Sequence, residues 1–208
     1  MKTDIIEVYS DTKGSDLAMQ EAEKFAEYYR LSHKDSMHLR LLTEEMISLV
    51  HGILDKFTGR LWLESQKKGN DLHCRICLSV EKEINREQED SFLSVSTNGK
   101  NENARGITGK IRELIRRSLQ SSSREDALYL ANVNDSMPGI ASGSTAFSSY
   151  ESEYWSLKVY RSQLASKKEE REEGDELEKS IIAKLADEVR VWLKDEMTEI
   201  VIEKTFRQ

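Results

Sequence analysis

The sequence predicts an α+β protein: a two-layer α/β sandwich in which a mostly antiparallel mixed sheet is covered on one face by helices. Three observations lead to this fold class. Short segments rich in β-branched and aromatic residues occur along the whole chain. Between them lie segments with apolar residues at steps of three and four, each with one apolar face. A hairpin-type turn, Lys67–Asn70, joins two neighbouring strand segments and indicates antiparallel pairing.

Each element has a signal in the chain. Periodic apolar residues and capping residues predict helices over Ser15–Leu31, Met37–Thr58, Ile107–Leu119, Ser123–Leu130 and Leu177–Leu193. Strand propensity and alternation predict strands over Asp4–Ser10, Gly59–Gln66, Asp71–Val80, Ser91–Thr97, Tyr154–Leu164 and Thr198–Phe206. Residues 134–152 are rich in serine and glycine, contain the only proline, and are predicted to form a mobile loop.

The helix predicted over Met37–Thr58 is the element around which the fold is organised. Ser36 is the expected N-cap, and Gly59 marks the expected exit from the helix. Its apolar residues recur at helical spacing without interruption: Leu39, Leu42, Met46, Leu49, Val50, Ile53 and Phe57. Such a stripe is typical of a helix that packs on a sheet.

Length and composition limit the class of protein. The 208 residues predict a single domain, 1–208, that is long enough to bury a sizeable core. A net charge of −7 argues against nucleic acid as a partner. No apolar run approaches the roughly 18 to 20 residues of a membrane span, and the N-terminus has no apolar signal region, so no membrane partner is expected. Two cysteines in a chain of this size favour a cytoplasmic location.

The segment Leu41–Gly52, LLTEEMISLVHG, carries a family resemblance. A strand and a helix, followed by this second helix and two sheet strands, resemble the GHKL (histidine kinase-like) ATPase fold. The nearest members in size are the anti-sigma-factor serine kinases. The resemblance implies ATP with Mg as cofactors. It also implies a helix glutamate that acts as a base or orients water, and an asparagine four residues later that ligates the magnesium ion.

Two registers fit this helix. If Glu44 is the family glutamate, Ser48 stands at the asparagine position and His51 and Gly52 follow. If Glu45 is the family glutamate, Leu49 stands there instead. At about 100° per residue, Glu45 flanks the apolar stripe whereas Glu44 and Ser48 lie nearer the opposite face. Leucine cannot ligate a metal and serine is a weak magnesium ligand, so both registers lack the family's metal ligand and no metal-binding residue is expected.

Two further family motifs can be compared with this chain. The family has an Asp-x-Gly-x-Gly turn after a strand, but here Glu81–Glu83 follows the strand Asp71–Val80 without glycine. The family also has a glycine-rich lid that opens a helix, whose amides hold phosphates. Asn98–Lys110 is the candidate lid. The resemblance therefore assigns nucleotide contacts to Ser48, Gly52, Lys100, Gly106, Gly109 and Lys110.

Simpler interpretations compete with these sites. Taken alone, Glu44 and Glu45 are more typical of a solvated helix face. Cys74 and Cys77 have metal or redox spacing, but residues three apart on a strand point to opposite faces. Because the chain has no second cysteine pair, two buried strand cysteines are the favoured interpretation.

Three hypotheses about function follow. The favoured one is a regulatory or protein-interaction module on a GHKL ATPase-like fold with weakened or lost nucleotide binding and with another protein as partner; whether it is an enzyme, an ATP-dependent kinase or ATPase, is left open. The alternative is a functional ATP-binding regulator or serine kinase resembling the anti-sigma factors. The third is an unrelated α+β protein. Whether the chain forms a homodimer is left open.

Overall fold

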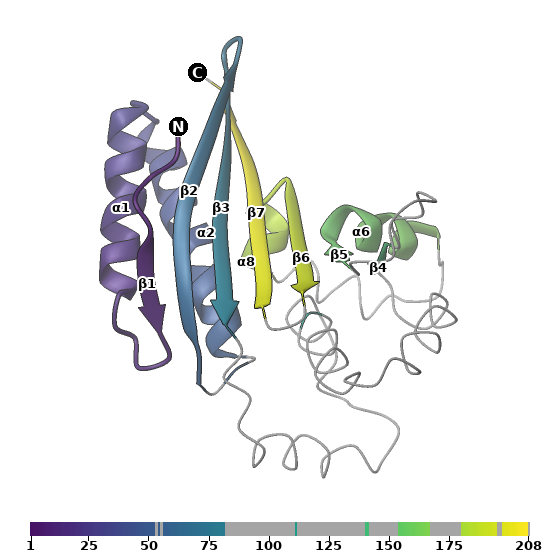
Figure 1. Cartoon of the computed structure of the whole chain (residues 1–208). Helices are drawn as coiled ribbons and strands as arrows, with labels where there is room; N and C mark the ends of the chain where they lie inside the picture. The colour runs from purple at the N-terminus through teal and green to yellow at the C-terminus, as the bar shows by residue number, and fades with distance from the viewer. Residues whose placement is uncertain are drawn as a thin grey trace, which may run out of the picture.

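In the part of the chain that the structure describes, seven strands form one sheet in the order β1-β2-β3-β7-β6-β5-β4, and every pairing between them is antiparallel (Figure 1). The computed structural model describes residues 1–52, 54, 56–81, 111, 140–141, 154–166, 180–194 and 197–207. The strands are β1 (Ile6–Tyr9), β2 (Thr58–Lys68), β3 (Asp71–Glu81), β4 (Ile140–Ala141), β5 (Tyr154–Ser156), β6 (Glu188–Lys194) and β7 (Met197–Arg207). Together with helices from the same chain, this sheet confirms the predicted α+β class.

Two helices follow β1 and pack side by side, as Figure 1 shows. The first is α1 (Ser15–Tyr28), whose entry turn contains Gly14 at φ 81°. A Cβ on Gly14 would lie 1.9 Å from the carbonyl oxygen of Glu7, so no side chain fits there. The second is α2 (His33–His51), which begins four residues earlier and ends seven residues earlier than predicted, so the prediction of Gly59 as its exit was wrong. Ser32 caps α2 by accepting a hydrogen bond from the Asp35 amide, so the prediction of Ser36 as cap was wrong.

The core lies between these helices and one face of the sheet. Alternate residues of β2, β3 and β7 belong to the core cluster, and the register aligns them across the sheet: Leu61 with Leu78, Leu63 with Ile76, and Ile76 with Ile202. They belong to one cluster with the apolar stripe of α2, which includes Leu39, Leu42, Met46, Leu49 and Val50. The predicted role of this helix as a core element is therefore confirmed.

The C-terminal part differs from the prediction in two segments. The segment predicted as a strand over Tyr154–Leu164 is a strand for three residues only and then becomes α6 (Leu157–Ser166). The segment predicted as a helix over Leu177–Leu193 contains the short α8 (Ile181–Leu185), described together with its cap Ser180, and then β6. In β6 the buried Val189 and Val191 alternate with half-buried Arg190 and Trp192, so burial follows the two-residue period of a strand. The prediction was wrong because some of the same apolar residues also fit a helical spacing.

The other predicted elements are distributed as follows. β1, β2, β3 and β7 agree with the predicted strands to within a few residues. Within 134–152, Ile140 and Ala141 form β4. The strand predicted over Ser91–Thr97 and the helix over Ser123–Leu130 lie outside the described residues, as does most of Ile107–Leu119. Ile111, which is described, is helical and buried in the core cluster.

Candidate functional site

The two predicted catalytic glutamates, Glu44 and Glu45, lie on α2 outside its buried stripe. Glu44 and Ser48 are exposed and lie one turn apart, whereas Glu45 is half-buried at the edge of the stripe. Gly52 is the C-cap, and its backbone N–H donates to the carbonyl oxygens of Ser48 and Val50. The structure thus brings Glu44 and Ser48 together as neighbours on one helix face.

The two registers predicted from the family resemblance place different side chains at the expected metal-ligand position. In the Glu45 register, Leu49 occupies the metal-ligand position, and its side chain is only 5% exposed within the core cluster. In the Glu44 register, the position belongs to Ser48, whose hydroxyl faces solvent. A solvated hydroxyl is a weak ligand for Mg²⁺, and a buried leucine is none. Neither register supplies a strong metal ligand from α2.

The C-terminal end of α2 lies at one end of the sheet. The ring of His51 contacts Phe57 at a centroid distance of 5.0 Å, and Phe57 directly precedes β2. There the first residue of β2, Thr58, pairs with the last residue of β3, Glu81, which in turn pairs with the first residue of β7, Met197. We call this the α2 end of the sheet.

One polar group at the α2 end was missed by the sequence reasoning. Thr198, opposite Val80, is 1% exposed, and its hydroxyl has no hydrogen-bond partner among the described residues. It shares the core-facing side of β7 with Ile200 and Ile202. A buried polar atom without a partner is uncommon and calls for an explanation. The sequence did contain a signal for its burial: in the alternating segment TEIVI, Thr198 occupies the same alternate positions as the two isoleucines.

The remaining predicted nucleotide contacts lie outside the described residues. These are Lys100, Gly106, Gly109 and Lys110 of the candidate lid, Asn98–Lys110. Of that loop and its following helix, Ile111 alone is described. The lid hypothesis therefore stays a prediction.

The two cysteines are structural. Both are free thiols within β3, where Cys74 shares the core-facing side and Cys77 points to the other face. Burial raises the pKa of the Cys77 thiol to about 12 and also raises the pKa of Cys74. A thiol must ionise to act as a nucleophile or metal ligand, so neither is reactive near neutral pH. The interpretation of two buried strand cysteines is confirmed.

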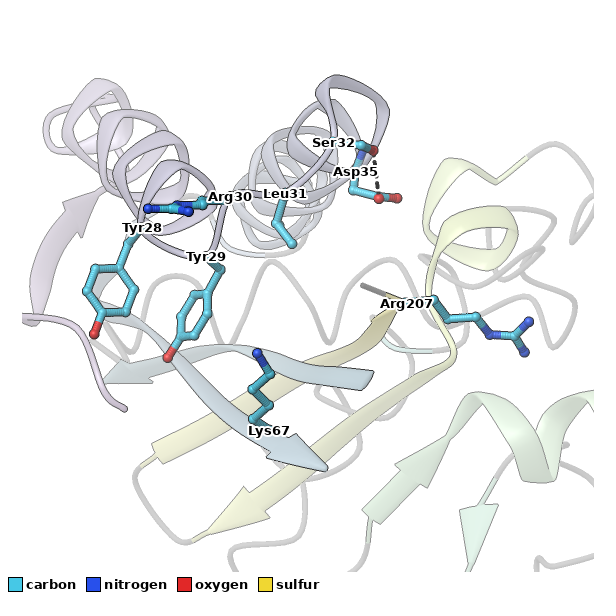
Figure 2. A pocket seen from close by; sticks show the side chains of 8 residues that line it. All are labelled: Tyr28, Tyr29, Arg30, Leu31, Ser32, Asp35, Lys67 and Arg207. Atoms are coloured by element: carbon cyan, nitrogen blue, oxygen red, sulfur yellow. Dashed lines mark hydrogen bonds between the residues drawn. The ribbon is translucent and has the colours of Figure 1, made fainter. Parts of the chain in front are cut away.

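Two cavities lie at the opposite end of the sheet, near the β2–β3 hairpin. The first, which we call the hairpin-end cavity, has a volume of about 590 Å³ and is lined by Tyr28, Tyr29, Arg30, Leu31, Ser32, Asp35, Lys67 and Arg207 (Figure 2). The second has a volume of about 630 Å³ and shares Ser32, Asp35 and Arg207 with the first. The sequence reasoning did not find them, because their linings come from the α1–α2 turn and three distant strand ends.

The second cavity has a balanced set of charges. Its carboxylates belong to Asp35, Asp71 and Asp187, and its cations to Lys34, Lys204 and Arg207. Asp187 accepts a hydrogen bond of 2.7 Å from the backbone N–H of Thr205 and lies 3.3 Å from the Lys204 ammonium. These contacts tie β7 to the residue before β6 and leave little net charge in this cavity.

Searches for two other kinds of site are limited to the described part of the chain. Among those residues, no three His, Cys, Asp or Glu side chains are grouped closely enough to hold a metal ion. No helix among them is both long and apolar enough to cross a membrane.

The chain was compared with families, curated proteins and solved structures. No family model matches it, and neither a curated protein nor a solved structure matches it. Inference about function therefore depends on the geometry and the sequence motifs.

Proposed function

We propose that this chain is a regulatory or protein-interaction module on a GHKL ATPase-like fold in which nucleotide binding is weakened or lost. The observation that carries the proposal is the state of the metal-ligand position on α2. It is either Ser48, which is solvated, or Leu49, which is buried in the core. Without a magnesium ligand, the charge of a bound triphosphate has no strong counter-charge from this helix.

The arrangement of elements also supports the proposal. A strand, two helices and a β-hairpin follow one another, with the second helix packed on the sheet as the family resemblance implies. We propose another protein as the partner and the cytoplasm as the location, and the two free thiols are consistent with a reducing compartment. No catalytic step is proposed.

Calorimetric titration with Mg-ATP and Mg-ADP tests the proposal. We expect no saturable heat at millimolar nucleotide. The Ser48→Asn variant restores an amide ligand on an exposed helix position, so it should bind Mg-nucleotide more tightly than the parent if Glu44 is the family glutamate. Ser36→Asn, on the same helix, is the matched control. Saturable binding by the parent at micromolar nucleotide would contradict the proposal.

The alternative function is an ATP-binding regulator or serine kinase resembling the anti-sigma factors. The observation that favours it is the buried hydroxyl of Thr198 at the α2 end of the sheet, for which the described residues supply no hydrogen-bond partner. A bound nucleotide would satisfy that hydroxyl. If this alternative holds, Thr198→Val should weaken nucleotide binding about tenfold, as for loss of one hydrogen bond in a buried site. Ser79→Ala removes another partnerless buried hydroxyl, on the other face of the sheet, and should have no effect on binding.

A further inference from the structure

The hairpin-end cavity carries an excess of positive charge. Arg30, Lys67 and Arg207 line it, and their side chains have no ion-pair partner among the described residues. The single carboxylate in the lining belongs to Asp35, which accepts a hydrogen bond of 2.7 Å from the Ser32 hydroxyl at the start of α2. An acidic side chain there is already stabilised by the helix N-terminus. Among the described residues, these three cations thus form no ion pair, on a protein whose net charge is −7.

The three cations do not converge on one point. In Figure 2, the Arg30 side chain extends beside Tyr28 at one side of the cavity, whereas the Arg207 side chain extends away at the other. Lys67 lies between them and points toward the helices. One small anion cannot contact both guanidinium groups in this arrangement. Negative charges that are themselves spread along a chain can contact them in turn, because an extended peptide advances about 3.3 Å per residue.

The same cavity offers an apolar contact. Tyr28 is 68% exposed, which is unusual for a large side chain, and its ring packs edge-on against Tyr29 at 4.9 Å. Tyr29 is held in turn by a hydrogen bond of 2.6 Å between its hydroxyl and that of Ser65 on β2. The Tyr28 ring is thus fixed from one side and open on the other. Exposed tyrosines of this kind are common anchors of protein interfaces.

We propose that the hairpin-end cavity is the docking site for an extended acidic peptide segment of a partner protein, with carboxylates facing Arg30, Lys67 and Arg207 and an aromatic or aliphatic side chain on Tyr28. This inference rests on the proposed function as a protein-interaction module and names the chemistry of its partner. It uses the end of the sheet opposite Glu44, Glu45 and Ser48, so it is independent of nucleotide.

Fluorescence anisotropy of the full chain tests this site. The probe is a fluorescein-labelled peptide of eight residues, seven glutamates and one central tryptophan, and the control probe has glutamine in place of glutamate. We expect the acidic probe to bind and the control probe not to bind. The double variant Lys67→Glu/Arg207→Glu should weaken binding about tenfold or more, because two attractive contacts become repulsive. Tyr28→Ala should weaken it by a smaller factor.

The matched control is Lys56→Glu/Lys184→Glu, which changes net charge equally at exposed lysines outside the cavity. It should leave the affinity close to that of the parent. Equal loss in both double variants would overturn the site, since it would show a response to net charge alone. Competition by millimolar inorganic phosphate at constant ionic strength would overturn the peptide in favour of a small-anion site. Concentration-dependent self-association that the cavity variants abolish would overturn it in favour of a second copy.

Failure here is distinguishable from failure of the proposed function. If the acidic probe does not bind and Mg-ATP also gives no heat, this docking site is overturned while the loss of nucleotide binding stands. If Mg-ATP binds saturably at micromolar concentration, the proposed function fails whatever the peptide does.

Discussion

The β1–β2–β3 half and the β5–β6 half of the sheet share one apolar core but differ in their buried polar contacts. On the β1–β2–β3 side, α1 and α2 pack through apolar side chains into one core, and each element has a clear buried face. On the β5–β6 side, the start of α6 is organised by a buried carboxylate. Glu188, 3% exposed, accepts hydrogen bonds from the Ser156 hydroxyl at 3.2 Å, the Lys158 amide at 3.2 Å and the Val189 amide at 2.9 Å.

This difference between the two halves shows where local sequence patterns are sufficient to predict structure. An apolar stripe is a local property, so it predicted α1 and α2. The N-terminus of α6 depends on Glu188, which lies 30 residues after Lys158 in the chain. No local pattern contains that contact, and there the predictions of strand and helix were wrong. Four changes test this contrast, in order of expected effect.

The largest effect should come from Leu61→Ala on β2. Leu61 is fully buried opposite Leu78, so the change removes apolar contacts and leaves a cavity. We expect a loss of about 2 to 5 kcal/mol in the free energy of unfolding, measured by urea denaturation. Leu17→Ala is the control, because Leu17 is 58% exposed, and it should cost less than about 0.5 kcal/mol. Similar costs for the two leucines would show that this side has no tight core.

Glu188→Ala should have the next largest effect. It leaves the Ser156 hydroxyl and the Lys158 amide without their acceptor, which should cost about 2 to 3 kcal/mol. Hydrogen exchange should increase first at the amides that begin α6. Glu188→Gln keeps one acceptor oxygen and should lose less. If Glu188→Ala unfolds at the same urea concentration as the parent, the two sides are both held by apolar packing and the contrast fails.

Ser32→Ala should cost about 1 kcal/mol, the usual value for loss of an N-cap. The control is Ser36→Ala, at the residue that the sequence predicted as cap and that lies inside α2. Alanine is the better helix former, so this control should leave stability unchanged or slightly higher. Urea denaturation of the two variants therefore compares the observed and predicted helix starts directly. The opposite ranking would place the cap at Ser36.

The smallest change in the free energy of unfolding at neutral pH should come from replacing the two thiols of β3. Their pKa values are raised in the folded chain, so folding favours the protonated thiol. The associated stability is complete below the ordinary pKa of 9.0 and is lost as pH rises toward the folded value, about 12 for Cys77. Urea midpoints should thus fall above about pH 9 in the parent and less steeply in Cys74→Ala/Cys77→Ala. At pH 8, a thiol reagent should label both cysteines only after unfolding; rapid labelling of the native chain would contradict their burial.

In the candidate site, as in the fold, some features follow from local sequence patterns and others depend on distant contacts. The positions of Glu44, Ser48 and Leu49 on α2 follow from helical periodicity, so their exposure or burial agrees with the pattern in the sequence. That the described residues leave the Thr198 hydroxyl without a hydrogen-bond partner could not be predicted, because it depends on what β3 and the helices place around that strand. The cations of the hairpin-end cavity come from positions 30, 67 and 207 and meet only in the folded chain.

The sequence by itself determined the fold class, the β2–β3 hairpin and the core role of α2. These follow from periods of two and 3.6 residues and from side-chain chemistry, which act over a few neighbouring residues. The tertiary structure alone decided that residues 157–166 form a helix, that 188–194 form a strand and that three distant cations share a cavity. Those outcomes depend on contacts between residues far apart in the chain, and a local pattern carries no information about such contacts.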